Sequence, residues 1–317
     1  MKRHLLIGLS FFFCLAAGNK TFSQTDISMA THWYNRGNYN PASIARTDYI
    51  YLFSNVRSQW TGITGAPRVA NVQVSGYFNS INSAFGLSAV NDQIGITNAL
   101  NPMLNYAYRL SNDQSWSLSF GVGLGAYIRT FDISSYAPVT DLDPALLRDV
   151  APQTKPDANI GVEFQNASFI IGISSTHLFS IFKDSTLFLN ANHRYGYAIY
   201  KNTRSEMLNY YLGVQVVNRS NIFVVEGNGT VRFKHPTGLS TGSREIFDLG
   251  LTYRSTRQLT ALFGVNLTEN FRVGYAYDQS FITGYNQNGS HEIMLEYRIP
   301  FQNAVCKTCR DQQLWYR

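Results

Sequence analysis

The chain has 317 residues, of which 15% are charged and 14% aromatic, and its formal net charge is +6. Soluble domains typically carry about 25% charged residues, so this sequence is unusually aromatic and weakly charged, although its mean hydropathy is only −0.15. The positive charge is not gathered into a Lys/Arg cluster, which argues against nucleic-acid binding.

The N-terminal segment has the layout of a secretory signal peptide, because a basic start precedes an apolar run over 5–17 and small or polar residues follow. Thr21 and Ser23 occupy the positions required for cleavage before Gln24. We therefore predict a signal peptide over 1–23. Its removal takes three of the 26 basic residues and leaves 23 against 20 acidic residues, a net charge near +3. A single anchor helix is disfavoured, since the apolar run is too short to cross about 30 Å of hydrocarbon.

No later segment reaches the roughly 18 apolar residues of a membrane helix. A closed β-barrel also satisfies every backbone amide in lipid, and it carries its apolar residues in alternate positions. The clearest example runs from Trp116 to Ile128, where every second residue is apolar and the residues between are Gly, Ser or Tyr. This run is long for a globular strand of about five or six residues but suits a tilted membrane strand.

Alternating runs of this kind predict strands near 48–56, 69–79, 84–91, 100–110, 115–130, 158–164, 167–174, 185–200, 206–217, 222–233, 245–253, 259–267, 270–280 and 290–301. Turn residues such as Asn, Asp, Ser and Gly separate many of them. We therefore predict an all-β fold: a transmembrane, antiparallel, up-and-down β-barrel of about 14 strands over 48–301, in the outer membrane and in contact with its lipids. The alternative is a soluble secreted β-sandwich or carbohydrate-binding module.

Three segments lie outside these strands. Residues 24–47 are predicted to form a periplasmic or luminal segment, and 302–317 a periplasmic C-terminal tail. The irregular stretch over 132–157 contains four prolines and is the best candidate for a large external or lumen-covering loop. The tail carries a CxxC pair, Cys306 and Cys309, which we interpret as a local structural pair or a partner contact, with redox or metal roles as the alternatives.

The sequence offers no recognisable catalytic site. The five histidines after the signal peptide are scattered, and neither an HExxH nor a GxSxG pattern occurs. The glycines at 121, 123 and 125 alternate within one predicted strand, so small lumen-facing residues explain them better than a nucleotide-binding loop does. We expect no enzymatic activity, no cofactor and no metal.

Several segments stand in a specific order and spacing: Asn40-Pro41-Ala42, Arg57-Ser58-Gln59-Trp60 with Gly62, Gly65-Ala66-Pro67, Val90-Asn91-Asp92-Gln93-Ile94-Gly95, Phe271-Arg272-Val273-Gly274-Tyr275-Ala276-Tyr277-Asp278 and Gly289-Ser290-His291-Glu292-Ile293-Met294-Leu295. Together they resemble the PorP/SprF family of type IX secretion system outer-membrane proteins of Bacteroidota. The residues that we single out as interaction candidates are Asn40, Pro41, Gln59, Trp60, Gly62, Gly65, Pro67, Asn91, Asp92, Cys306 and Cys309.

The resemblance implies a non-enzymatic barrel of the protein secretion and gliding motility apparatus. Its implied partners are periplasmic lipoprotein or ring subunits and peptidoglycan-linking subunits, and some members instead support export or anchoring of one surface adhesin. The alternative functions are a porin-like outer-membrane transporter and an outer-membrane enzyme. We further hypothesise that residues 59–67 shape a periplasmic or luminal plug rather than a substrate site.

Overall fold

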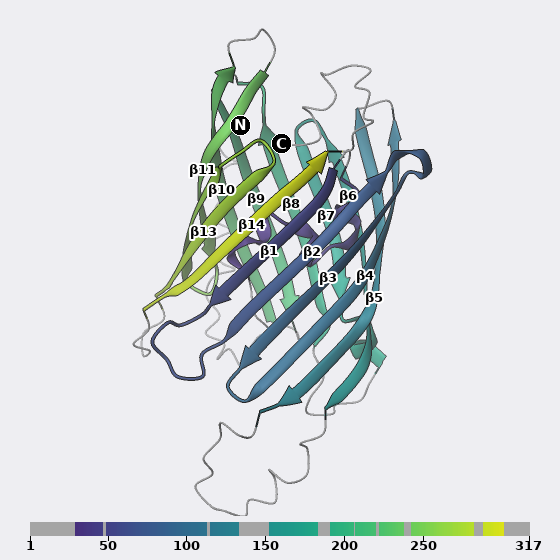
Figure 1. Ribbon diagram of the computed structural model, residues 1–317, viewed down its shortest axis with the longest axis vertical. Coiled ribbons are helices and arrows are strands. Elements are labelled where there is room, and N and C mark those ends of the chain that lie inside the picture. Colours follow the sequence, from purple (N-terminus) through teal and green to yellow (C-terminus); the bar gives the residue numbers. More distant parts are fainter. Residues whose placement is uncertain are drawn as a thin grey trace, which may run out of the picture.

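The computed structural model describes residues 29–46, 49–112, 115–132, 152–182, 191–205, 207–219, 222–237, 242–281 and 288–300. These residues form fourteen antiparallel strands in a closed barrel, in which each strand pairs with its neighbours in sequence and β1 pairs with β14 (Figure 1). The strands are β1 (Tyr49–Ser58), β2 (Arg68–Phe78), β3 (Ser83–Ile94), β4 (Thr97–Asn112), β5 (Trp116–Phe131), β6 (Gln153–Asn166), β7 (Phe169–Thr176), β8 (His193–Asn202), β9 (Leu208–Arg219), β10 (Ile222–Thr237), β11 (Gly242–Arg254), β12 (Gln258–Asn266), β13 (Phe271–Ser280) and β14 (Ser290–Pro300). The predicted fold class and strand number are confirmed.

Alternation along each strand separates an apolar outer face from a polar lumen. On β5, Ser117 and Ser119 are buried inside the barrel, whereas Phe120 and Leu124 are 45% and 56% exposed on its outside. Leu, Ile, Val, Phe and Tyr side chains are exposed in the same way on the other strands. Such a continuous apolar exterior is stable in hydrocarbon and not in water, so the barrel is a transmembrane one.

The two ends of the barrel differ. At one end, called the terminal end here, β1 begins and β14 ends, and the connection between β6 and β7 covers only positions 167–168. At the opposite loop end, the β5–β6 connection covers 132–152 and the β7–β8 connection 177–192. Two short 3-10 turns lie in the connections. The turn η4 (Asn79–Ile81) joins β2 to β3 at the terminal end, and η6 (Leu178–Phe182) lies between β7 and β8 at the loop end. None of the helices in the described part of the chain is long or apolar enough to span a membrane.

Two predicted strands start five or more positions away from where the structure places them. The sixth strand begins at Gln153, whereas the sequence predicts a start at 158, since a proline such as Pro156 is typical of a loop. Pro156 pairs with Ala126 of β5, but β7 pairs with β6 only from Ile160 onward, so Pro156 lies on a locally unpaired edge where proline is tolerated. The eighth strand begins at His193 rather than 185, and positions 183–190 lie outside the described residues.

Candidate functional site

Residues 29–46, called the plug here, lie inside the lumen as three short 3-10 turns: η1 (Ala30–Trp33), η2 (Arg36–Asn38) and η3 (Pro41–Ile44) (Figure 1, purple). Asn35 and Asn40 are fully buried and start the second and third turns. Their side-chain oxygens accept hydrogen bonds from the amides of Gly37 (3.1 Å) and Ala42 (2.9 Å). These caps satisfy backbone donors that such short turns leave unpaired.

Two carboxylates of the barrel wall hold the first part of the plug. Glu292 of β14 accepts hydrogen bonds from the amides of Ala30 (2.7 Å) and Thr31 (3.2 Å), and also from the Thr31 hydroxyl. Asp248 of β11 accepts a hydrogen bond from the Tyr34 hydroxyl at 2.5 Å. Burial and the nearby Asp248 carboxylate raise the pKa of Tyr34 above its ordinary value. Tyr34 is therefore protonated and remains a hydrogen-bond donor.

Two further carboxylates hold the plug through charged or basic groups. The guanidinium of Arg36 donates to both oxygens of Glu163 on β6, at 2.8 and 3.2 Å. The Nε2 atom of His32 lies 3.1 Å from Glu226 of β10. Both carboxylates are buried. The plug is thus attached to strands on different sides of the lumen rather than to one wall.

Three of these four carboxylates are also paired with arginines of the wall. The pairs are Arg57 with Glu292 (3.3 Å), Arg254 with Glu226 (2.6 Å), and Arg272 with Asp248. Glu292 and Asp248 therefore each bridge a wall cation and a plug donor, and Glu226 lies between Arg254 and the His32 ring. The wall arginines keep these carboxylates charged, and a hydrogen bond from the plug to a charged carboxylate contributes about 1.5–3 kcal/mol.

The predicted Asn40-Pro41 pair lies at the centre of the plug. The Asn40 Nδ2 atom donates to the Tyr197 hydroxyl (2.7 Å) and to the Val162 carbonyl (3.2 Å), while Tyr197 donates to Glu163 at 2.5 Å. Pro41 occupies the first position of its turn, where a missing N–H has no cost. In this structure the two residues position the plug.

Glycines in the wall make room for the plug. A Cβ atom at Gly121 of β5 would overlap the backbone of Pro41 and Ala42, and a Cβ at Gly161 of β6 would overlap the Asn40 side chain. A side chain at Gly213 of β9 would meet the indole ring of Trp33 in the same way. The plug and the wall therefore fit each other only because these wall positions lack side chains.

Residues 59–67 do not form the plug, contrary to the hypothesis from the sequence. They connect β1 to β2 at the loop end, where Gly62 (φ 97°), Gly65 (φ 73°) and Trp60 (φ 49°) adopt left-handed conformations that turn the chain back. Thr61 exchanges backbone hydrogen bonds with the β13–β14 connection, donating to Gly289 (2.9 Å) and accepting from Asn288 (3.2 Å). Loop geometry accounts for the glycines of this segment.

The remaining predicted residues occupy other places. Gln59 donates its amide to the Pro67 carbonyl at 2.9 Å and closes the base of the β1–β2 connection. Asn91 and Asp92 lie near the end of β3, beside β2, and so share the loop end with that connection but not with Asn40. The tail residues Cys306 and Cys309 lie outside the described residues.

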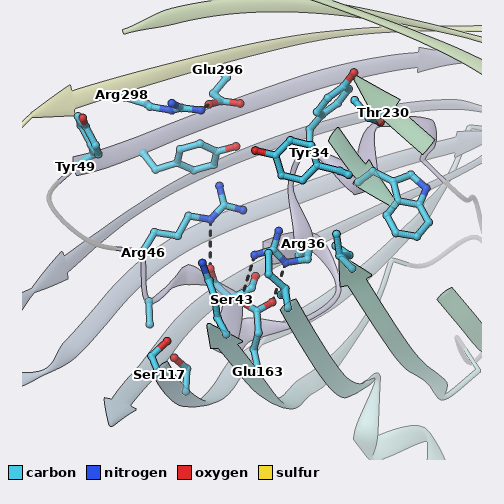
Figure 2. Close-up of a pocket in the computed structure, with 18 of the residues that line it drawn as sticks. Tyr34, Arg36, Ser43, Arg46, Tyr49, Ser117, Glu163, Thr230, Glu296 and Arg298 are labelled. Atoms are coloured by element: carbon cyan, nitrogen blue, oxygen red, sulfur yellow. Dashed lines mark hydrogen bonds and ion pairs between the residues drawn. The ribbon is translucent and has the colours of Figure 1, made fainter. Parts of the chain in front are cut away.

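The plug separates two cavities in the lumen. The loop-end cavity is lined by Met29, His32 and Tyr39 of the plug and by wall residues that include Asp92 and His177. The terminal-end cavity is lined on the opposite side of the plug by Tyr34, Arg36, Ser43 and Arg46, among others (Figure 2). The plug thus lies between the two cavities.

Among the described residues, no three His, Cys, Asp or Glu side chains come together as a metal site. The four carboxylates that hold the plug were not predicted from the sequence, although one signal was present. Each is a charged residue at a lumen-facing position of a strand, and ionisable residues within membrane-spanning segments commonly have a structural or functional partner. These residues are Glu163, Glu226, Asp248 and Glu292.

The family model described as "Type IX secretion system membrane protein PorP/SprF" matches residues 21–297. None of the curated proteins matches this chain. The match covers the plug and all strands except the end of β14.

Solved structures with a similar shape are outer-membrane barrels of low sequence identity. The toluene transporter TodX of Pseudomonas putida is 8% identical, with coverage of 90% of this chain and 96% of TodX and a TM-score of 0.47. The CymD monoaromatic hydrocarbon channel is 12% identical, with 88% and 95% coverage and a TM-score of 0.47. The outer-membrane protein Omp33 of Acinetobacter baumannii is 8% identical, with 80% and 99% coverage and a TM-score of 0.44.

Proposed function

Since this chain belongs to the PorP/SprF family of type IX secretion system membrane proteins, we propose that it is a closed, non-enzymatic outer-membrane anchor for other subunits of that secretion system. The observation that carries this proposal is the plug. Four buried carboxylates on β6, β10, β11 and β14 attach it to the wall. A barrel closed in this way supports a structural role, in which the barrel fixes a point in the membrane and its ends contact partners.

The unequal connections support an orientation. Bacterial outer-membrane barrels have short periplasmic turns and longer extracellular loops. By this rule the terminal end, with its 167–168 connection, faces the periplasm, and the loop end, with its 132–152 connection, faces the exterior. We propose that the partners bound at the terminal end are the periplasmic lipoprotein or ring subunits and the peptidoglycan-linking subunits.

Support for the export or surface anchoring of one adhesin is a second candidate. The observation that favours it is the β1–β2 connection, which is held to its neighbours by backbone hydrogen bonds and exposes Ile63 at the loop end. An ordered apolar side chain on this rim offers a contact for a protein outside the membrane. The alternative of a porin-like transporter requires that the plug moves.

The deciding experiment deletes the gene and compares the surface proteome and general outer-membrane permeability with those of complemented cells. An anchor of the whole apparatus predicts that many secreted proteins disappear together, whereas an adhesin-specific role predicts the loss of one. Crosslinked complexes purified through the barrel should contain periplasmic subunits. An unchanged surface proteome, or high ion conductance of the purified barrel in a planar bilayer, would contradict the proposal.

A further inference from the structure

The terminal-end cavity has a volume of about 130 Å³ and lies between the plug and the wall. In Figure 2, Arg36 and Arg46 of the plug and Arg298 of β14 surround its interior. Arg46 and Tyr49 are only partly buried, so they form a rim toward the terminal end. An engineered apolar cavity of about 150 Å³ accepts a molecule the size of benzene. The cavity is therefore large enough for a group of a few non-hydrogen atoms.

The described residues that line this cavity include six arginines but only two carboxylates, Glu163 and Glu296. Two more carboxylates, Glu245 and Asp248, pair with lining arginines. The resulting ion pairs are Arg36 with Glu163, Arg232 with Glu245, Arg272 with Asp248, and Arg298 with Glu296. The other two lining arginines are Arg46 and Arg109. The cavity thus carries more cationic than anionic groups.

Arg46 forms no ion pair with any described residue. Its Nε atom donates to the Ser43 carbonyl at 3.3 Å, its Nη2 atom lies 3.5 Å from the Asn35 Oδ1 atom, and its guanidinium lies 4.4 Å from the centre of the Tyr51 ring. These contacts position the guanidinium without neutralising it. Glu163 and Glu296 lie close enough to interact with this charge but form their ion pairs with Arg36 and Arg298. A guanidinium in a polar cavity that has no ion-pair partner of its own attracts an anion.

Buried donors in the same lining lack acceptors. The Nε atoms of Arg232 and Arg272 and the Nε1 atom of Trp33 have no hydrogen-bond partner among the described residues. Because these three atoms have almost no accessible surface, they lie behind the groups that face the cavity, and an occupant would reach them only after neighbouring side chains move. The preference for an anionic ligand therefore rests on the arginines that line the cavity.

We propose that this cavity binds a small organic carboxylate, either as a free acid or as the carboxyl end of a peptide that enters from the terminal end. Arginine matches the planar, two-oxygen geometry of a carboxylate. Trp33, Tyr34, Ile170 and Ile199 also line the cavity, and they would pack against the carbon atoms of such a ligand. A bare phosphate would leave these apolar groups without a contact.

Binding is tested by calorimetry on the purified full-length barrel in detergent, with N-acetyl-glycyl-glycine as the peptide probe, propionate as the free-acid probe, and the carboxamide of the peptide as an uncharged analogue. We expect the peptide to bind and the carboxamide not to bind. Arg46→Gln should weaken binding at least tenfold, and Arg46→Lys should weaken it less because the charge is kept. The matched control is Arg68→Gln, an exposed arginine at the loop end, which should leave binding unchanged.

The two probes separate the sources of the carboxylate. Peptide binding that is tighter than propionate binding identifies a chain end as the ligand, and equal binding identifies a free acid. The proposal is overturned if neither probe binds, if the carboxamide binds as well as the acid, or if inorganic phosphate displaces the peptide at equal concentration. Unchanged binding in a folded Arg46→Gln barrel would also overturn it. Because only the purified barrel is needed, each of these results is independent of the anchoring role.

Discussion

Arg36 of the plug and Glu163 of β6 form a two-point ion pair in the lumen, with the Arg36 Nε and Nη2 atoms 2.8 and 3.2 Å from the two carboxylate oxygens. Glu163 also accepts the hydroxyl of Tyr197, which in turn accepts a hydrogen bond from Asn40. This chain of contacts joins the plug to β6 and β8. The ion pair therefore links the position of the plug to the stability of the barrel.

Glu163→Gln is expected to lower the free energy of unfolding by about 3–5 kcal/mol, because it leaves the Arg36 guanidinium buried without a counter-charge. The double variant Arg36→Gln/Glu163→Gln should lose less than the sum of the two single losses. Urea unfolding in lipid vesicles measures all three. Arg68→Gln, on the exposed outer face of β2, is the control and should change stability by no more than about 0.5 kcal/mol. Strictly additive losses would show that the two side chains do not interact.

Asn40 has two separable roles, since its oxygen caps η3 and its Nδ2 atom donates to Tyr197 and to the Val162 carbonyl. Asn40→Asp keeps the capping oxygen but removes both donated hydrogen bonds and adds a buried negative charge. We expect Asn40→Asp to destabilise the barrel by more than Asn40→Ala, for which about 1–3 kcal/mol is expected. Asn79→Ala, at an exposed site in η4, serves as the control. If Asn40→Asp proved as stable as the wild type, only the cap would matter.

Gly121→Ala tests whether the plug closes the lumen. The added methyl group would overlap the plug backbone at Pro41 and Ala42, which cannot rotate away as a side chain could. We expect a loss of about 1–3 kcal/mol together with ion conductance in planar bilayers above the wild-type level. Gly227→Ala on β10 adds the same methyl group in open space and should leave both quantities unchanged. Equal conductance of the two variants would mean that the plug does not set the permeability.

The strands were predictable from the sequence because alternation is a local signal. The apolar face formed by Phe120, Val122 and Leu124 can be recognised within a few residues, because the alternation does not depend on the rest of the chain. The misplaced start of β6 had a local cause as well. A proline such as Pro156 usually ends a strand, and only the pairing pattern reveals that this part of β6 lies beyond the end of β7.

The plug was predictable only as a non-strand segment of the periplasm or lumen. Its 3-10 turns are three or four residues long and show no periodicity. Its contacts are also remote in sequence: Ala30 and its partner Glu292 are 262 positions apart. In the sequence, the carboxylates that bind the plug cannot be distinguished from other lumen-facing polar residues, because only the fold brings them next to the plug. The terminal-end cavity escaped prediction for the same reason.

The β1–β2 connection provides a direct test of orientation. Ile63 is 40% exposed at the loop end, and Glu269 is exposed in the β12–β13 connection at the terminal end. We expect Ile63→Cys, made in a Cys306→Ser/Cys309→Ser background, to react with a membrane-impermeant maleimide on intact cells. Glu269→Cys in the same background should react only after the outer membrane is permeabilised. Each readout uses one engineered thiol, so the two ends are reported separately.

The same reagent tests the tail of the wild-type protein. β14 ends at Pro300 at the terminal end, which we propose faces the periplasm. We therefore expect the CxxC pair that follows to be periplasmic and to remain unlabelled on intact cells. We therefore expect Ile63→Cys to react on intact cells, and Glu269→Cys to react only after permeabilisation. Cys306 and Cys309 should also react only after permeabilisation, once the native pair has been reduced. Labelling of Glu269→Cys but not of Ile63→Cys on intact cells would mean that the barrel has the opposite orientation in the membrane. In that case the arginine-lined cavity would open to the exterior, and the anchoring surface for periplasmic subunits would have to be sought among the loop-end connections.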